Sequence, residues 1–364
     1  MMISFSFLQK KRYRAALLGL TFLVVLGLAA LIDGVFENYD SVSGPQTGII
    51  NEQAFPLQEI SGMYLFPKKA GQEQKVYLVG DTKASLGISY WNGTKLRNHK
   101  VIDFSLAIGR KWGLCKSLKV SGCEDYLKMI TSQWEAVTSD KSEKAFLLHE
   151  QLGTIFVFDP DSDEIVSLIN LDSFTMGADK TRYKSTVSKE NAMGEGMILL
   201  RNGHILVIKE RYKPSVIEFG PPGSEPEGYD KDLWVSDQYE FPITGKQYTM
   251  VPLKIWTIPK QHKNCDLSEL SPDQSGNLWV LSQQCSWLAG LSDLYVNESE
   301  MGFKSFLRLP SKLKKAEAFI IPEPGLFVVA EDKQSMKRPN IYMIRSEEQK
   351  PSRSTKEKPV SLVN

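Results

Sequence analysis

Carboxylate side chains recur within a short pattern that appears five times along the sequence. The pattern is Ser or Glu, then usually a small residue, then an apolar residue. Its copies are Ser61-Gly62-Met63, Glu135-Ala136-Val137, Glu195-Gly196-Met197, Ser268-Glu269-Leu270 and Glu317-Ala318-Phe319. Several carboxylates brought to one place repel one another unless a cation neutralises them. Calcium suits that role because it accepts about six to eight oxygen ligands in loose geometry.

Two sets of candidate site residues lie at or near the pattern. The candidate calcium ligands are Glu59, Asp81, Glu135, Glu195, Asp266 and Glu317. The candidates for a catalytic or ligand-binding role are Glu195, Glu210, Lys209, Arg211 and His149. A site with both a metal and cationic side chains suits an anionic ligand such as a phosphate or a carboxylate.

The elements that position these residues are predicted to be hairpins. In four of the five copies, an apolar run ends on a polar pair fourteen and fifteen residues after the pattern begins, as in AFLL before His149-Glu150. The first copy has five extra residues in its turn. Turn residues such as Asn202-Gly203 separate the two halves of each repeat. The start of the first strand and the end of the second then lie side by side, at what we call the motif rim.

Repeats of about 40–60 residues that each carry several short strands are typical of an all-β fold, the β-propeller. We expect five blades, with a six-bladed ring as the alternative if 107–132 or 220–250 hides a degenerate repeat. The N-terminal strand should complete the last blade and close the ring. Segment 220–250 should lie on the side away from the motif rim. The predicted blades are 59–106, 133–171, 193–258, 266–309, and 315–345 together with 46–57.

Each candidate residue also has a structural interpretation. Glutamates in the first strand of a blade can bond to the backbone of the neighbouring blade and hold the ring together. Glu210 can form a structural ion pair with Lys209 or Arg211. His149 is more often a structural donor than a catalyst when no other histidine stands at metal-ligand spacing, as here.

The N-terminal region predicts export to the periplasm or the extracellular space. Residues 1–14 carry four basic residues and are expected in the cytoplasm, and residues 15–32 are uncharged and long enough to span a bilayer. We favour a retained signal anchor over a cleaved signal peptide because the apolar run is long and the cleavage site is weak. Residues 33–45 are predicted to be a stalk, 46–345 the propeller, and 346–364 a disordered tail.

The cysteines and the charge agree with export. Hairpin geometry places Cys265 opposite Cys285, which predicts a disulfide across the fourth blade, and Cys115 and Cys123 would close a small loop. Without the four N-terminal basic residues, 40 Lys and Arg stand against 43 Asp and Glu, so the exported part carries about −3. No basic field favours nucleic acid as a partner.

A family resemblance rests on three segments. IKERYKPSVIEF (208–219) resembles the Glu-x-x-x-Pro-Ser strand of the "esterase-like activity of phytase" domain, and EISGM (59–63) and DLSEL (266–270) resemble repeats of the SdiA-regulated propellers. The resemblance covers about 46–345. It implies a calcium-dependent extracytoplasmic propeller with phosphoester hydrolysis as the nominal activity, and it places Glu59, Glu195, Glu210 and Asp266 at acidic motif positions.

Three functions remain open at this point. The first is a membrane-anchored binding or scaffold propeller with a possible calcium site and an unidentified partner. The second is a calcium-dependent phosphoester hydrolase in which Lys209 or Arg211 binds the phosphate and the metal activates a water molecule. The third is a sugar or lactone enzyme of another propeller type. The sequence has no GxSxG, HExxH or P-loop motif that would choose between them.

Overall fold

Antiparallel strands make up most of the regular structure in the computed structural model, which describes residues 44–112, 131–172 and 193–346 except 212, 237, 334 and 336. One sheet contains β2 (Ile60–Leu65), β3 (Gln74–Gly80), β4 (Lys83–Trp91) and β5 (Leu96–Asp103). A second contains β14 (Glu269–Pro272), β15 (Leu278–Ser282), β16 (Trp287–Leu291) and β17 (Phe303–Arg308). A third contains β18 (Ala316–Glu323), β19 (Leu326–Glu331), β20 (Ile341–Ser346) and β1 (Thr47–Gln53).

The fourth sheet has eight strands, in two halves. The first half is β6 (Trp134–Ser139), β7 (Ala145–His149), β8 (Thr154–Asp159) and β9 (Glu164–Leu171). The second half is β10 (Met193–Leu199), β11 (Ile205–Lys209), β12 (Ser215–Gly220) and β13 (Gln247–Thr257). The described helices are α2 (Ser105–Trp112), η1 (Lys231–Leu233) and η2 (Lys260–His262).

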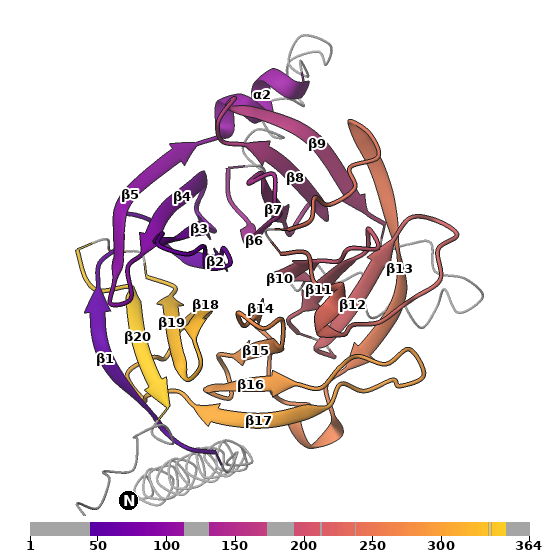
Figure 1. Cartoon of the computed structure of the whole chain (residues 1–364). Coiled ribbons are helices and arrows are strands. Elements are labelled where there is room, and N and C mark those ends of the chain that lie inside the picture. The colour runs from indigo at the N-terminus through magenta and orange to yellow at the C-terminus, as the bar shows by residue number, and fades with distance from the viewer. Residues whose placement is uncertain are drawn as a thin grey trace, which may run out of the picture. The chain divides into compact units, whose positions relative to one another are not determined.

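The sheets surround a common centre (Figure 1). Their innermost strands β2, β6, β10, β14 and β18 contact one another in this order, and β18 contacts β2. Five clusters of buried apolar side chains fill the spaces between successive sheets and between the two halves of the eight-stranded sheet. This radial arrangement is that of a β-propeller, as the repeats predict.

The ring closes through its N-terminal strand, which confirms that prediction. Strand β1 pairs antiparallel with β20, from Thr47 opposite Ser346 to Gln53 opposite Ile341. The buried Asn340 side chain accepts a hydrogen bond from the Phe55 amide and donates to backbone carbonyls of the same segment. Side-chain and backbone bonds together therefore hold the first strand in the last sheet.

The join between the two halves of the eight-stranded sheet is a feature that the repeats did not predict. Strand β13 begins within the segment 220–250, and its first residues pair in parallel with β9, from Gln247 opposite Leu168 to Met250 opposite Leu171. The outer edge of β9 is thereby covered, which removes unpaired backbone groups from that edge.

Close approach of the innermost strands explains the small residue in the repeated pattern. A Cβ atom on Gly196 would lie 2.4 Å from the amide nitrogen of Leu270 in the next innermost strand. A Cβ atom on Gly62 would lie 2.9 Å from the Cα atom of Ala136. A larger residue at either position would push neighbouring strands apart at the centre of the ring.

The segment between β12 and β13 lies away from the motif rim, as expected. The Phe241 amide donates to the carboxylate of Asp140, which lies in the β6–β7 turn, at 2.7 Å. The Tyr229 hydroxyl donates to the carbonyl of Gly276, in the β14–β15 turn, at 2.6 Å. This segment therefore ties together turns on the side opposite the rim.

Several predictions concern residues outside the described part of the chain. The expected spanning segment 15–32, the stalk 33–45 up to residue 43, nearly all of the tail 346–364, and Cys115 with Cys123 all lie there. Among the residues that are described, no helix has the length and apolar character needed to cross a membrane.

Candidate functional site

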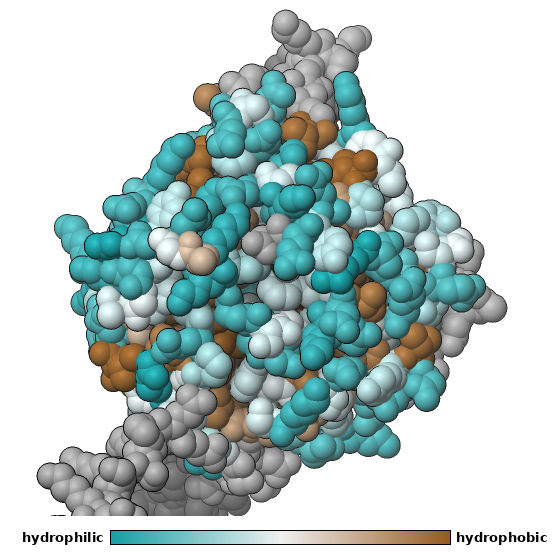
Figure 2. Space-filling view, in the orientation of Figure 1, coloured by the Kyte–Doolittle hydropathy of each residue, from teal (hydrophilic) through white to brown (hydrophobic). Residues whose placement is uncertain are grey.

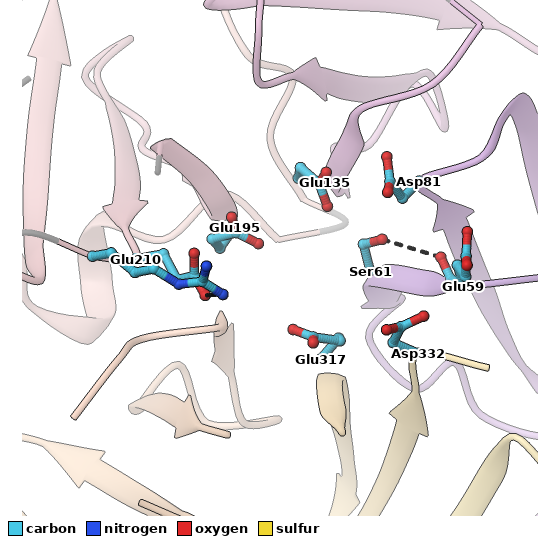
Figure 3. Close-up of a pocket in the computed structure, with 9 residues that line it drawn as sticks. Glu59, Ser61, Asp81, Glu135, Glu195, Glu210, Glu317 and Asp332 are labelled. Carbon is cyan, nitrogen blue, oxygen red and sulfur yellow. Dashed lines mark hydrogen bonds and ion pairs between the residues drawn. The ribbon is translucent and has the colours of Figure 1, made fainter. Parts of the chain in front are cut away.

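A cavity of about 220 Å³ lies at the motif rim, in the middle of the ring. The strand starts and strand ends of several repeats meet there, and seven of the nine side chains that line it carry a carboxylate (Figure 3). Its lining consists of Glu59, Ser61, Asp81, Glu135, Glu195, Glu210, Arg211, Glu317 and Asp332. We call this space the acidic cavity.

Five of the six expected calcium ligands line the acidic cavity, and Asp266 does not. Asp266 is 3% exposed and lies in a neighbouring pocket. Its carboxylate accepts hydrogen bonds from the Ser282 hydroxyl at 2.6 Å and from the Gln284 amide at 2.9 Å. These bonds hold Asp266 to the turn after β15, so it acts there as a structural acceptor.

Glu135 and Glu195 are the most strongly perturbed groups of the acidic cavity. Burial, followed by the carboxylates of Asp81 and Glu150, raises the pKa of Glu135 well above its usual value of 4.5. Burial, followed by Glu135 and Glu210, raises the pKa of Glu195 in the same direction. Like charges that are held together away from water favour protonation, or a bound cation in place of the proton.

Glu317 and Glu210 are perturbed for the same reason but less strongly. Burial and the carboxylates of Glu210 and Asp266 raise the pKa of Glu317 to about 8. Burial raises the pKa of Glu210 to about 7, although the guanidinium of Arg211, whose Nη2 lies 2.6 Å from Glu210 Oε1, opposes the shift. Glu210 and Arg211 therefore form the ion pair that was the structural alternative for these residues.

The carboxylates converge on the cavity without forming a ready-made chelate. Glu135, Glu195 and Glu317 come from three different innermost strands and point toward the same open space (Figure 3). In the part of the chain that the structure describes, no group of three acidic, His or Cys side chains stands close enough to hold a metal ion directly. The donor atoms are oxygens, the ligand type that calcium takes, but among the described residues they do not stand close enough together to chelate an ion directly.

Other acidic residues of the rim have structural roles. The buried carboxylate of Glu269 accepts hydrogen bonds from the Met63 amide at 3.3 Å and from the Leu270 amide at 2.9 Å, so it links β14 to β2. Glu331 accepts from the Lys314 amide at 3.1 Å and forms an ion pair with Lys333. For these two residues the structural interpretation is supported.

Two of the catalytic candidates, Lys209 and His149, are not among the residues that line the acidic cavity. Lys209 is fully buried, and its ammonium donates to the carbonyl of Arg211. His149 is also fully buried, its Nδ1 accepts from the Leu152 amide at 3.3 Å, and its ring packs edge-on against Trp134. Neither residue lines the acidic cavity.

Ser61 and Asp332 line the cavity although neither was among the expected ligands. Ser61 donates to the Glu59 carbonyl at 3.1 Å (dashed line in Figure 3). Both residues occupy repeated positions, since Ser61 begins the first pattern and Asp332 ends the polar pair of the fifth. The repeat therefore contained the signal for both.

The predicted disulfide between Cys265 and Cys285 is confirmed. The two Cα atoms are 5.3 Å apart, and the bridge joins the segment before β14 to the turn after β15. It therefore fixes the fourth hairpin at its rim end.

On the face of the molecule drawn in Figure 2, side chains are mainly hydrophilic, and apolar ones are scattered rather than gathered in one patch. The exposed large apolar residues lie in separate elements, for example Ile50, Leu106 and Tyr295. A broad apolar docking surface is therefore not a feature of this face.

Comparison with known proteins leaves the family undetermined. No family model matches the sequence, and no curated protein matches it. The short motifs that resemble the phytase-like and SdiA-regulated propellers are thus not supported by a family match.

Among solved structures, the chain is similar to propeller proteins at a low level. The Cps50 (Swd1) β-propeller domain of Myceliophteria thermophila is 11% identical, with 80% of this chain and 72% of that chain covered and a TM-score of 0.35. A streptogramin B lyase is 8% identical, with 84% and 99% covered and a TM-score of 0.37. Virginiamycin B lyase from Staphylococcus aureus is 9% identical, with 82% and 73% covered and a TM-score of 0.33. Similarity this weak carries no conclusion about activity.

Proposed function

We propose that this protein is a binding propeller whose acidic cavity holds a divalent cation, with calcium as the ion that its oxygen donors suit best. Each half of the eight-stranded sheet counts as one blade in this proposal, which gives a five-bladed ring. An N-terminal signal anchor would hold the propeller at the outer face of a membrane, in the periplasm or outside the cell.

One observation carries the proposal. Seven carboxylates line one small cavity, and the single cation among the lining residues, Arg211, is already paired with Glu210. Glu195 is only 9% exposed, lines the cavity and has no hydrogen-bond donor among the described residues. A carboxylate in that position is stabilised by a proton or by a cation, and a cavity of this size has room for an ion with bound water.

The hydrolytic alternative has weaker support. A phosphoester would bring negative charge to a cavity that is already acidic, and the repulsion would have to be offset by metal ions and cationic side chains. Lys209 donates to a backbone carbonyl inside the protein, and the charge of Arg211 offsets that of only one of the seven carboxylates, since its Nη2 pairs with Glu210. The charge balance therefore favours binding of a cation over binding of a phosphate at this cavity.

Calcium binding to the full-length protein tests the proposal. Isothermal titration and thermal melting are measured at pH 8 in a chelator-treated buffer and with calcium or magnesium added. We expect calcium to raise the melting temperature and to bind with a measurable heat. The Glu195→Gln variant should lose at least tenfold in calcium affinity, because it removes a buried charge that the ion would neutralise.

A matched control is Glu323→Gln, since Glu323 is exposed on β18 and forms a surface pair with Arg345. It should bind calcium as the wild type does. If neither metal binds the wild type at pH 8, the cation proposal is wrong. Protonation alone then neutralises Glu135, Glu195 and Glu317.

A further inference from the structure

A second cavity, of about 580 Å³, opens beside the acidic cavity and has a different charge. Its lining consists of Arg211, Asp266, Gln283, Gln284, Ser286 and Lys314. Only Arg211 also lines the acidic cavity. We call this space the side pocket. Its volume is within the range of small-molecule sites, about 300–1,000 Å³.

The charged groups of the side pocket leave it with an excess of positive charge. Its one carboxylate, that of Asp266, is buried and accepts hydrogen bonds from its own turn. The Arg211 side chain is 58% exposed, and its Nη2 pairs with Glu210. A guanidinium carries five N–H donors, so the exposed part of Arg211 can still donate to a ligand. The exposed ammonium of Lys314 forms no ion pair with any described residue.

The wall of the side pocket is rigid. The Cys265–Cys285 disulfide fixes the turn that carries Gln283, Gln284 and Ser286. Within this turn the Cys285 amide donates to the Ser282 hydroxyl at 3.2 Å, and the Ser286 carbonyl accepts from the Leu309 amide at 3.0 Å. A preorganised wall lowers the entropy that a ligand loses on binding.

We propose that the side pocket binds a small hydroxylated anion, with its carboxylate or phosphate group between Arg211 and Lys314. Arg and Lys recognise anionic oxygens through charge-assisted hydrogen bonds. The amide side chains of Gln283 and Gln284 carry both donors and acceptors, which suits hydroxyl groups on the same ligand. The nearby acidic cavity would repel such a ligand, so a cation held there would strengthen anion binding. This last coupling, and only this, rests on the proposed function.

Isothermal titration of the full-length protein with gluconate, glucose 6-phosphate and uncharged glucose tests the proposal. We expect at least one anion to bind with a dissociation constant below about 10 mM at low salt, and glucose to bind at least tenfold more weakly. The two anions separate a carboxylate ligand from a phosphate ligand. Lys314→Gln should weaken binding of the preferred anion by about threefold to tenfold.

The matched control is Lys312→Gln, because Lys312 pairs with Glu52 and lies outside the pocket lining. It should leave anion binding unchanged. The proposal would be overturned if glucose bound as tightly as the anions, or if no probe bound at all. It would also be overturned if Lys314→Gln left the affinity for the anion unchanged. Anion binding that calcium does not change would refute only the coupling between the two cavities, because the cation site itself is tested by direct calcium binding. Added calcium that tightens anion binding would support both sites.

Discussion

Replacing Glu317 by Gln should reduce the loss of stability that rising pH causes when no divalent cation is present, because it removes one of several carboxyl groups whose pKa is raised by folding. Burial and neighbouring carboxylates raise the pKa of Glu317 from 4.5 to about 8 in the folded protein. Between these two values the folded state binds more protons than the unfolded state. The free energy of unfolding must therefore fall as the pH rises through this window.

The size of the effect follows from the shift. A difference of about 3.5 pH units, at about 1.36 kcal/mol per unit, gives an upper value of about 5 kcal/mol above pH 8. Glu317 keeps some contact with solvent, so water can relieve part of this cost, and we expect about 2–5 kcal/mol. Gln has nearly the same shape and no charge, so the variant avoids this cost at high pH. At pH 4.5 the variant and the wild type should differ by less than about 1 kcal/mol, since Glu317 is protonated there in the folded state.

Urea unfolding of the two proteins with chelator present, in half-unit steps from pH 4.5 to pH 9, measures the difference. The Glu323→Gln variant supplies the matched control on the same strand, because its side chain is half exposed. Parallel curves for the wild type and Glu317→Gln across the whole range would refute the reasoning. If the cavity binds calcium, adding calcium at pH 8.5 should raise the free energy of unfolding of the wild type more than that of Glu317→Gln.

Three further predictions concern residues that stabilise the ring. Each is checked by measuring the free energy of unfolding in denaturant. Replacing both Cys265 and Cys285 by Ser should cost about 2–4 kcal/mol, because the bridge closes a loop with a sequence separation of 20 residues. Reduction of the wild type should cost at least as much, because it would also open the predicted Cys115–Cys123 bridge. Glu269→Ala should cost about 1–3 kcal/mol, since two buried backbone amides lose their acceptor, and Glu269→Gln should cost less. Asn340→Ala should cost about 2–4 kcal/mol, because it releases backbone groups of 55–57, and a loss below 0.5 kcal/mol would contradict the role given to this side chain.

The hairpins could be predicted from the sequence because the register of two paired strands requires a fixed spacing between the residues that lie opposite each other. Trp134 lies opposite His149, and Ala316 lies opposite Glu331. Both pairs are separated by 15 positions, close to the offset read from the repeats. The same spacing placed Cys265 near Cys285. A hairpin constrains position strongly, so local patterns were sufficient for these predictions.

The role of each rim residue depended on contacts that a spacing does not contain. Asp266 and Glu59 both lie two residues before the pattern in their repeats, yet Asp266 binds its own turn and Glu59 lines the acidic cavity. Lys209 and Arg211 are two residues apart, but only Arg211 reaches solvent. The parallel pairing of β13 with β9 joins segments that are distant in sequence and share no motif. These features are decided by tertiary packing.

Pairing of β1 with β20 has a consequence for how the chain matures. The two partners are Thr47–Gln53 and Ile341–Ser346, almost at opposite ends of the described chain. During synthesis the partner of β1 does not exist until almost all of the described residues have been made. A product that stops short of residue 341 leaves β1 and β19 each with an open edge, and such edges recruit other chains. Completion of the last strand therefore separates a closed ring from an aggregation-prone fragment.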